Sequence, residues 1–306
     1  MIEVENLTKK FGNLTAVDDL SFHVNEGEIF GFLGPNGAGK TTTVRMLSCL
    51  ISKTSGSARV AGYDIGNDAD SMKIRQIIGV VPDDLGLYED LSAYENLDFY
   101  GKLYGCTEIQ RKESIQRLLT MLGLWEKRDA ASGTFSKGMK QKLAIARALI
   151  HDPKILFLDE PTANLDPISA KTVRDFILEL KNERKTIFLN THNLDEVQRI
   201  CDRVAILKTR LIAVGTPNDL KESLWLSKTV IQVDEVNDRI LKALDALSLK
   251  KITTNKNRLI IDVTNSEKEN PGIVDAIVRA GGRIQLVTDV SPTLEDVYLD
   301  KVGEIK

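Results

Sequence analysis

The chain has 306 residues, of which 42% are hydrophobic and 28% are charged, and its formal net charge is −3. This length predicts two domains, and the slight acidic excess argues against nucleic acid as a partner. No apolar run is long enough to cross a bilayer, and the N-terminus lacks the basic start and apolar core of a signal peptide. We therefore expect the chain to be cytoplasmic.

The first motif in the chain is a phosphate-binding loop. An apolar run at residues 29–33 predicts a buried strand, and residues 42–50 predict a helix. Between them the pattern G-x-x-x-x-G-K-[ST] is filled at every specified position. The segment comprises Gly34, Pro35, Asn36, Gly37, Ala38, Gly39, Lys40, Thr41 and, at the start of the helix, Thr42. Backbone N–H groups of such a loop converge on phosphate oxygens. Lys40 is expected to reach the β- and γ-phosphates and Thr41 to ligate Mg²⁺, so the loop predicts a bound nucleoside triphosphate.

Helical periodicity runs through residues 85–148. The apolar residues that recur at helical spacing are Tyr94, Leu97, Tyr100 and Leu103, then Ile115, Leu118, Leu119 and Leu122. Towards the end of this region the segment FSKGMKQ, at residues 135–141, precedes another helical pattern. Ser136 is expected to cap that helix, which would leave N–H groups and a hydroxyl free to face an anion. The segment therefore predicts a second phosphate site.

A pair of acidic residues follows the next apolar strand. The strand predicted at residues 154–158 is followed directly by Asp159 and Glu160. Carboxylates in this position lie at the sheet edge where open α/β folds bind ligands. Asp159 is expected to organise the Mg²⁺ shell, and Glu160 to orient and polarise the attacking water. A further apolar strand at residues 186–190 is followed by Thr191 and His192.

Together these segments resemble ATP-binding cassette (ABC) proteins over residues 1–220. FSKGM is similar to the family's signature LSGGQ and to its exporter variant LSKGM. The acidic pair, the loop at residues 164–166, Thr191-His192 and Phe11 follow the family's order. The resemblance implies an α/β P-loop ATPase that binds ATP, with an antiparallel β subdomain and a helical subdomain at about residues 85–148. It also implies a homodimer with composite sites, in which the signature of one subunit covers the γ-phosphate held by the other.

The resemblance assigns further roles residue by residue. Phe11 matches the aromatic residue that stacks on adenine, the alternative being a core Phe at a strand end. His192 matches the histidine that contacts the γ-phosphate and helps to hold the attacking water. Asp166 matches the loop that couples the two sites. Ser136 and Gly138 lie in the signature that contacts the nucleotide.

Two positions depart from the family pattern. Asp83 stands where the family usually has Gln, in contact with the metal and the water. A carboxylate is a hard ligand for Mg²⁺, yet the γ-phosphate would repel it, so Asp83 either senses the metal through a water or weakens its coordination. Lys137 replaces the first glycine of the signature, and it either pairs with phosphate or lies in solvent.

The chain changes character after the cassette. Strands at residues 203–207 and 211–214 predict a hairpin, and Gly215 to Pro217 end the cassette. Residues 225–306 predict a small α+β domain with the ferredoxin-like order β-α-β-β-α-β and a closing helix. The ranges expected for these elements are 229–233, 236–247, 250–253, 258–263, 273–280, 283–288 and 294–299. The segment Ser291–Tyr298 is similar to the accessory domain of ABC-2-type exporter ATPases, where it would serve dimerisation, regulation or stabilisation.

The expected function is ATP hydrolysis that powers an ABC transporter, specifically an ABC-2-type exporter. The partners would be separately encoded integral-membrane permease subunits, which hold the chain on the inner face of the cell membrane and meet it near residues 87–90. The alternative is a soluble cassette that acts without a membrane partner. A GTPase is disfavoured because the base-reading motif N-K-x-D fails at Arg258, and an inactive cassette because Lys40, Asp159, Glu160 and His192 are all present.

Overall fold

The computed structural model describes residues 1–222, 227–247, 249, 251–290 and 293–303. The chain divides into two compact units, Met1–Pro217 and Asn218–Lys306. Parts of the predicted tail lie outside the described residues, namely its first residues at 225–226, Ser248, Lys250, Ser291 with Pro292, and residues 304–306. Within the described ranges, no helix combines the length and the apolar character that a membrane span requires.

The first unit is built on a six-stranded sheet whose strand order is β10-β9-β3-β8-β7-β6. These strands are β3 (Ile29–Leu33), β6 (Ile78–Val81), β7 (Ile155–Asp159), β8 (Thr186–Thr191), β9 (Arg203–Lys208) and β10 (Arg210–Gly215). The strands from β6 to β9 pair in parallel, whereas β10 pairs antiparallel with β9, as the hairpin prediction required. Strands β3, β7 and β8 are buried along their whole length, which explains their continuous apolar sequences. The carboxyl ends of these strands therefore meet at one edge.

A second, antiparallel sheet has the order β2-β1-β4-β5. Its strands are β1 (Ile2–Phe11), β2 (Leu14–Val24), β4 (Ser55–Val60) and β5 (Tyr63–Asp64). A cluster of phenylalanines joins the two sheets: the Phe22 ring of β2 stacks on Phe30 of β3, with centroids 5.4 Å apart and planes 8° apart. The Phe188 ring packs against Phe22, Phe30, Phe32 and Phe157. This core fixes the strand that leads into the phosphate-binding loop.

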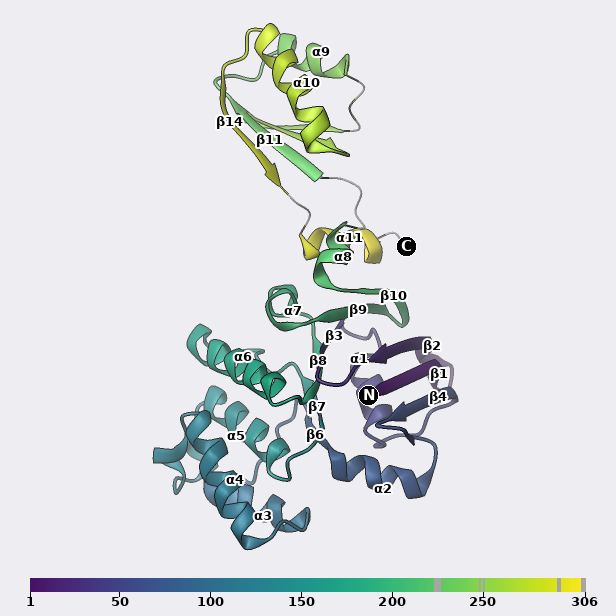
Figure 1. Cartoon of the computed structure of the whole chain (residues 1–306), viewed down its shortest axis with the longest axis vertical. Coiled ribbons are helices and arrows are strands. Elements are labelled where there is room, and N and C mark those ends of the chain that lie inside the picture. The colour runs from purple at the N-terminus through teal and green to yellow at the C-terminus, as the bar shows by residue number, and fades with distance from the viewer. Residues whose placement is uncertain (223–226, 248, 250, 291–292, 304–306) are drawn as a thin grey trace. The chain divides into compact units, whose positions relative to one another are not determined.

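The helices of the first unit fall into two groups. Helices α1 (Lys40–Leu47), α2 (Asp68–Ile77), α6 (Pro167–Asn182) and α7 (Leu194–Ile200) connect the strands. Helix α8 (Pro217–Glu222) begins at the last residue of this unit and otherwise belongs to the second. The helical subdomain contains α3 (Ala93–Leu103), α4 (Glu108–Met121) and α5 (Lys137–Leu149). Figure 1 shows these three helices together on the opposite side of the parallel sheet from β1, β2 and β4.

The packing face of α3 differs from the predicted one at its end. Leu97 is fully buried, but Leu103 is 66% exposed. The predicted pattern takes every third residue. Because three residues turn an α-helix by about 300°, each step moves the pattern by roughly 60° around the helix, away from the side that packs on its neighbours. The residues that α3 buries are Ala93, Asn96, Leu97 and Gly101. In α4, by contrast, Ile115, Leu118 and Leu119 are all buried, as their spacing predicts.

The second unit has a four-stranded antiparallel sheet with the order β12-β13-β11-β14. Its strands are β11 (Ser227–Val233), β12 (Ile252–Asn255), β13 (Arg258–Val263) and β14 (Ile284–Val290), and its helices are α9 (Asp238–Asp245), α10 (Ser266–Arg279) and α11 (Leu294–Gly303). The buried core consists of Ile231, Val233, Leu259, Ile261 and Val263 with Ile240, Leu244, Ile273 and Ile277. This is the predicted ferredoxin-like arrangement. Helix α10 begins earlier than expected because Asn265 caps it and the helix continues through Pro271.

Candidate nucleotide site

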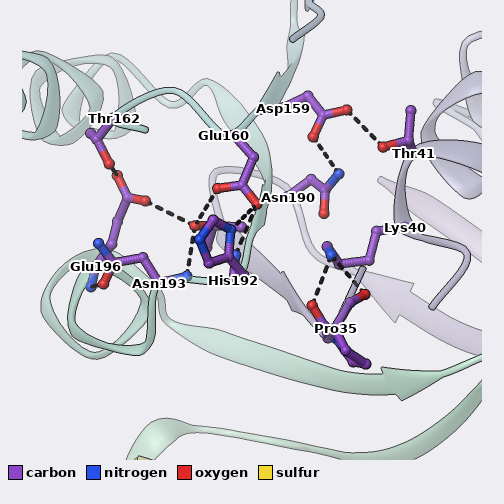
Figure 2. A network of polar contacts seen from close by, with 12 residues as sticks. Pro35, Lys40, Thr41, Asp159, Glu160, Thr162, Asn190, His192, Asn193 and Glu196 are labelled. Atoms are coloured by element: carbon purple, nitrogen blue, oxygen red, sulfur yellow. Dashed lines mark hydrogen bonds and ion pairs between the residues drawn. The ribbon is translucent and has the colours of Figure 1, made fainter. Parts of the chain in front are cut away.

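The phosphate-binding loop lies between the end of β3 and the start of α1. Gly39 has φ 93°, and a Cβ atom there would lie 2.4 Å from the carbonyl oxygen of Ala16, so only glycine fits. Lys40 is buried, and its Nζ donates to the carbonyl oxygens of Gly34 (2.8 Å) and Pro35 (3.2 Å). Burial lowers the pKa of Lys40, while the charges of Glu160 and Asp159 oppose that shift. Figure 2 shows the Lys40 ammonium beside the loop.

Asp159 ends β7 next to this loop. Its Oδ2 accepts a hydrogen bond from Thr41 Oγ1 at 2.9 Å, and its Oδ1 accepts one from Asn190 Nδ2 at 2.5 Å. Burial raises the pKa of Asp159, the charges of Glu160 and Asp83 add to this effect, and the Thr41 hydroxyl opposes it. The structure thus brings Thr41 and Asp159 together and places the Asp83 charge within electrostatic reach of them.

These oxygens suit Mg²⁺. The described ranges contain no group of three or more His, Cys, Asp or Glu side chains that could hold a metal. Mg²⁺ keeps several waters and takes only one or two carboxylates when it binds with a nucleotide. A hydroxyl and a carboxylate joined by a 2.9 Å hydrogen bond, as in Thr41 and Asp159, match that requirement.

Glu160 and His192 meet from the ends of adjacent strands. Glu160 has φ 47°, a strained backbone conformation of the kind that concentrates at functional sites. Its Oε1 accepts the backbone N–H of His192 at 3.0 Å and lies 2.6 Å from His192 Nδ1. The carboxylate is mostly buried, whereas the imidazole ring is exposed. Figure 2 shows the two side chains in contact.

A buried polar network on the far side of Glu160 was not predicted. Glu160 Oε2 lies 3.2 Å from Thr191 Oγ1, and the same hydroxyl lies 3.2 Å from Glu196 Oε2. Glu196 Oε1 accepts a hydrogen bond from Thr162 Oγ1 at 2.8 Å. An acid in the first turn of a helix is ordinarily favoured by the helix dipole, so the sequence around Glu196 gave no sign of burial.

The signature segment starts α5 and packs against α6. Ser136 Oγ accepts the N–H of Met139 at 3.3 Å, which confirms the predicted N-cap. A Cβ atom at Gly138 would lie 2.7 Å from Ser169 Oγ, so this glycine lets the two helices approach. Asp166 caps α6, with Oδ1 accepting the N–H groups of Ile168 and Ser169 at 3.0 Å each.

A cavity of 190 Å³ lies beside the acidic pair. Its lining includes Asp83, Asp159, Glu160, the loop residues Ala163, Asn164 and Leu165, and from α5 Lys137, Lys140 and Gln141. Lys137 is exposed, and Gln141 is 8% exposed. Within the described structure the Nε2 atom of Gln141 has no hydrogen-bond partner. The signature helix therefore lies close to the acidic residues of its own chain.

Phe11 is the last residue of β1 and is 49% exposed. The alternative of a core Phe is therefore wrong. Lys9 Nζ lies 4.9 Å from the ring centroid, and much of the ring stays open to a stacking partner.

Comparisons with known proteins agree with this geometry. Residues 17–163 match the family described as ABC transporter, and residues 215–302 match the family described as ATP-binding protein DrrA1-3-like, C-terminal domain. The linearmycin resistance ATP-binding protein LnrL of Bacillus subtilis (strain 168) is 38% identical, over 99% of this chain and 98% of that protein. The Nod factor export ATP-binding protein I of Rhizobium sp. (strain N33) is 37% identical, over 99% and 97%.

A solved structure shows the same fold. The dimeric post-hydrolysis state of the ATP-binding cassette MJ0796, bound to ADP and Pi, superposes with a TM-score of 0.65 and 26% identity, over 71% of this chain and 98% of that one. The chain belongs to the ATP-binding proteins of ABC transporters. It is an ATPase subunit that powers a transporter of the exporter kind, and a cassette without a membrane partner is not favoured.

Proposed function

We propose that two copies of this chain bind and hydrolyse MgATP at composite sites, and so drive an ABC-2-type exporter through separately encoded permease subunits. The observation that carries the proposal is the convergence of Thr41 with Asp159 and of Glu160 with His192 at one sheet edge, next to Lys40 (Figure 2). This edge is where α/β folds of this type bind ligands.

The phosphate chain would be held by the loop of residues 34–41. Its N–H groups and the positive end of α1 favour anionic oxygens, and Lys40 adds a charge that is already partly dehydrated. Thr41 and Asp159 would hold Mg²⁺, with Asp83 acting on its shell. When bound, Mg²⁺ neutralises phosphate charge. Phe11 would stack on the adenine with the exposed part of its ring.

Glu160 is the proposed base that orients and polarises the attacking water. Its Oε1 is fixed by the His192 N–H, and the neighbouring imidazole is exposed and so free to contact a γ-phosphate. The φ of 47° at Glu160 holds the carboxylate at the end of β7, where the water would lie.

The second copy would complete the site. Ser136 and Gly138 begin a helix of 13 residues whose positive end suits a γ-phosphate bound to the partner. Asp166 caps α6, on which Gly138 packs, so this loop is placed to transmit a change at the signature. The dimeric cassette with ADP and Pi supports this arrangement.

The surface for the permease is proposed on the helical subdomain. Tyr88 is 48% exposed, and its ring packs edge-on against Phe99 with centroids 5.1 Å apart. Tyr100 packs against both rings. Exposed aromatic patches of this kind mark interaction sites. Contact with the permease here would hold the chain on the inner face of the cell membrane.

Affinity capture tests the proposal. A tagged Glu160→Gln chain is recovered with ATP from detergent-solubilised membranes and analysed by mass spectrometry. The expected result is a polytopic membrane protein, in smaller amounts when Tyr88→Ala is added. Recovery of soluble or ribosomal partners alone would contradict the transporter assignment.

A further inference from the structure

Glu196 is a buried acid that has no role in the hydrolysis proposed above. It lies in the first turn of α7 and is 1% exposed. Its Oε1 accepts the Thr162 hydroxyl at 2.8 Å, and its Oε2 lies 3.2 Å from Thr191 Oγ1. Figure 2 shows Glu196 between Thr162 and the Glu160 side of the network. Burial raises the pKa of Glu196, and the charge of Glu160 adds to this, while Thr162, Thr191 and Arg174 oppose it.

The Thr191 hydroxyl determines which protonation state fits. Its oxygen accepts the Asn193 N–H at 3.0 Å and lies 3.2 Å from both Glu160 Oε2 and Glu196 Oε2. A hydroxyl has one proton to donate and accepts at most two hydrogen bonds. If both carboxyl groups were ionised, they would compete for that single proton and repel one another.

A neutral Glu196 removes this conflict. Its Oε2–H then donates to Thr191 Oγ1, and the Thr191 hydroxyl donates to Glu160 Oε2. With the Asn193 N–H, every donor and acceptor of the Thr191 hydroxyl is used. Glu160 is thereby tethered through both oxygens, Oε1 by the backbone N–H and the ring Nδ1 of His192 and Oε2 by Thr191, and Oε2 keeps a second lone pair for the water.

We propose that Glu196 is a positioning residue, held as a neutral carboxylic acid, that aligns the Thr191 hydroxyl on Glu160 and so fixes the carboxylate that orients the attacking water. This inference rests on the proposed role of Glu160. It adds a buried donor chain, Glu196 to Thr191 to Glu160, that controls the orientation of the base.

The surroundings agree with a neutral acid. Arg174 of α6 acts on Glu196 only through its charge, and among the described residues no ion pair involves Glu196. Strand β3, which packs against α7, carries no titratable side chain. Cys201, just after α7, has a pKa raised well above its usual value by burial and stays a neutral thiol. Asp195 and Arg199 of α7 are exposed.

Paired substitutions test the chain of donors in the full-length protein. Thr191→Val removes the hydroxyl and Thr191→Ser keeps it, while Glu196→Gln keeps a donor and Glu196→Ala removes it. Thr191→Val and Glu196→Ala should lower kcat about tenfold, with an unchanged KM for ATP, because misplacing a base forfeits part of general-base catalysis. Thr191→Ser and Glu196→Gln should retain kcat within about twofold, since the donor geometry survives.

The matched control is Thr186→Val. Thr186 is fully buried on the same strand, and its hydroxyl accepts the Gly27 N–H far from the acidic pair. This variant should lose stability without the loss of kcat. A loss of kcat in Thr186→Val equal to that in Thr191→Val would make the effect merely structural and overturn the proposal.

Two further measurements report the protonation state. Above the raised pKa the wild-type Glu196 ionises, so kcat should fall on the alkaline side, and Glu196→Gln should lack this fall. The infrared difference spectrum between wild type and Glu196→Gln should show the carbonyl band of a protonated carboxylic acid at neutral pH. A missing band, or a Glu196→Gln variant as slow as Glu196→Ala, would overturn the proposal.

The infrared measurement tests the protonation of Glu196 independently of the proposed role of Glu160. Glu160→Gln is assayed alongside, and full turnover in that variant would refute the role of Glu160. The protonated-acid band of Glu196 does not depend on turnover and decides the state of Glu196 in either case.

Discussion

The buried carboxylate of Asp159 is held by Thr41 and Asn190 and lies within reach of two other negative charges. Because its pKa is raised in the folded protein, folding favours the protonated form, and the ionised form at neutral pH costs stability. Asp159→Asn should therefore raise the melting temperature at pH 7 while it abolishes ATP hydrolysis. Thermal melts across a pH series measure this.

The raised pKa of Asp159 also determines how the stability gain of Asp159→Asn changes with pH. As pH falls through the raised pKa, wild-type Asp159 becomes neutral, so the advantage of Asp159→Asn should shrink in acid. A variant that melts below wild type at neutral pH, or whose advantage grows towards acid, would refute the argument.

Asp83 provides a second test at this scale. Its charge helps to raise the pKa of Asp159, and we propose that it acts on the same metal shell. Asp83→Gln should preserve activity, whereas Asp83→Ala should lower coupled transport in permease-containing vesicles more than it lowers ATP binding. Equal losses of ATP binding and transport in Asp83→Ala would contradict this role for Asp83.

The sequence predicted where single candidate residues lie when a local motif specifies them, while their roles stay predictions. Lys40, Thr41, Asp159 and Glu160 follow from the loop and strand patterns, and their convergence follows from parallel strands that end at one edge. The tether through Thr191 and Glu196 could not be predicted, because although these two residues are 5 positions apart, their contacts with Glu160 and Thr162 span 31 and 34 positions.

The N-terminal caps of helices α5 and α3 can be compared by substitution. Ser136 caps α5 and Ser92 caps α3, each through a hydroxyl that accepts a backbone N–H. Changing either serine to alanine should cost about 0.5–2 kcal/mol of stability. Only Ser136→Ala should also lower ATP turnover, because only that helix start is proposed to face a phosphate. Urea melts and ATPase assays compare the pair, and an equal loss of turnover in Ser92→Ala would contradict the assignment.

Element boundaries were less predictable than element types. The predicted buried face of α4 was confirmed, because the apolar residues there follow the helical repeat of about 3.6 residues. The pattern predicted for α3 uses steps of three residues, so it leaves the buried face of the helix before Leu103. Gly138 shows a similar limit: the signature motif explained it by nucleotide contact, while the structure shows that it also permits α5 to approach Ser169.

At the scale of the whole molecule, the two units have separate cores. Ile261→Ala creates a cavity in the second core and should destabilise that unit by about 2–5 kcal/mol. Calorimetry should show a lower transition for the second unit, with the cassette transition and the KM for ATP unchanged. An equal downward shift of both transitions would show instead that the units unfold together.

We propose that ATP joins two copies of this chain at composite sites where Glu160 orients the attacking water. Static light scattering of Glu160→Gln with and without MgATP tests it most directly, with the Lys40→Ala, Glu160→Gln double variant as control. The mass should double with MgATP in Glu160→Gln alone. A Glu160→Gln chain that binds MgATP and keeps the mass of a monomer would rule out ATP-driven pairing of two copies.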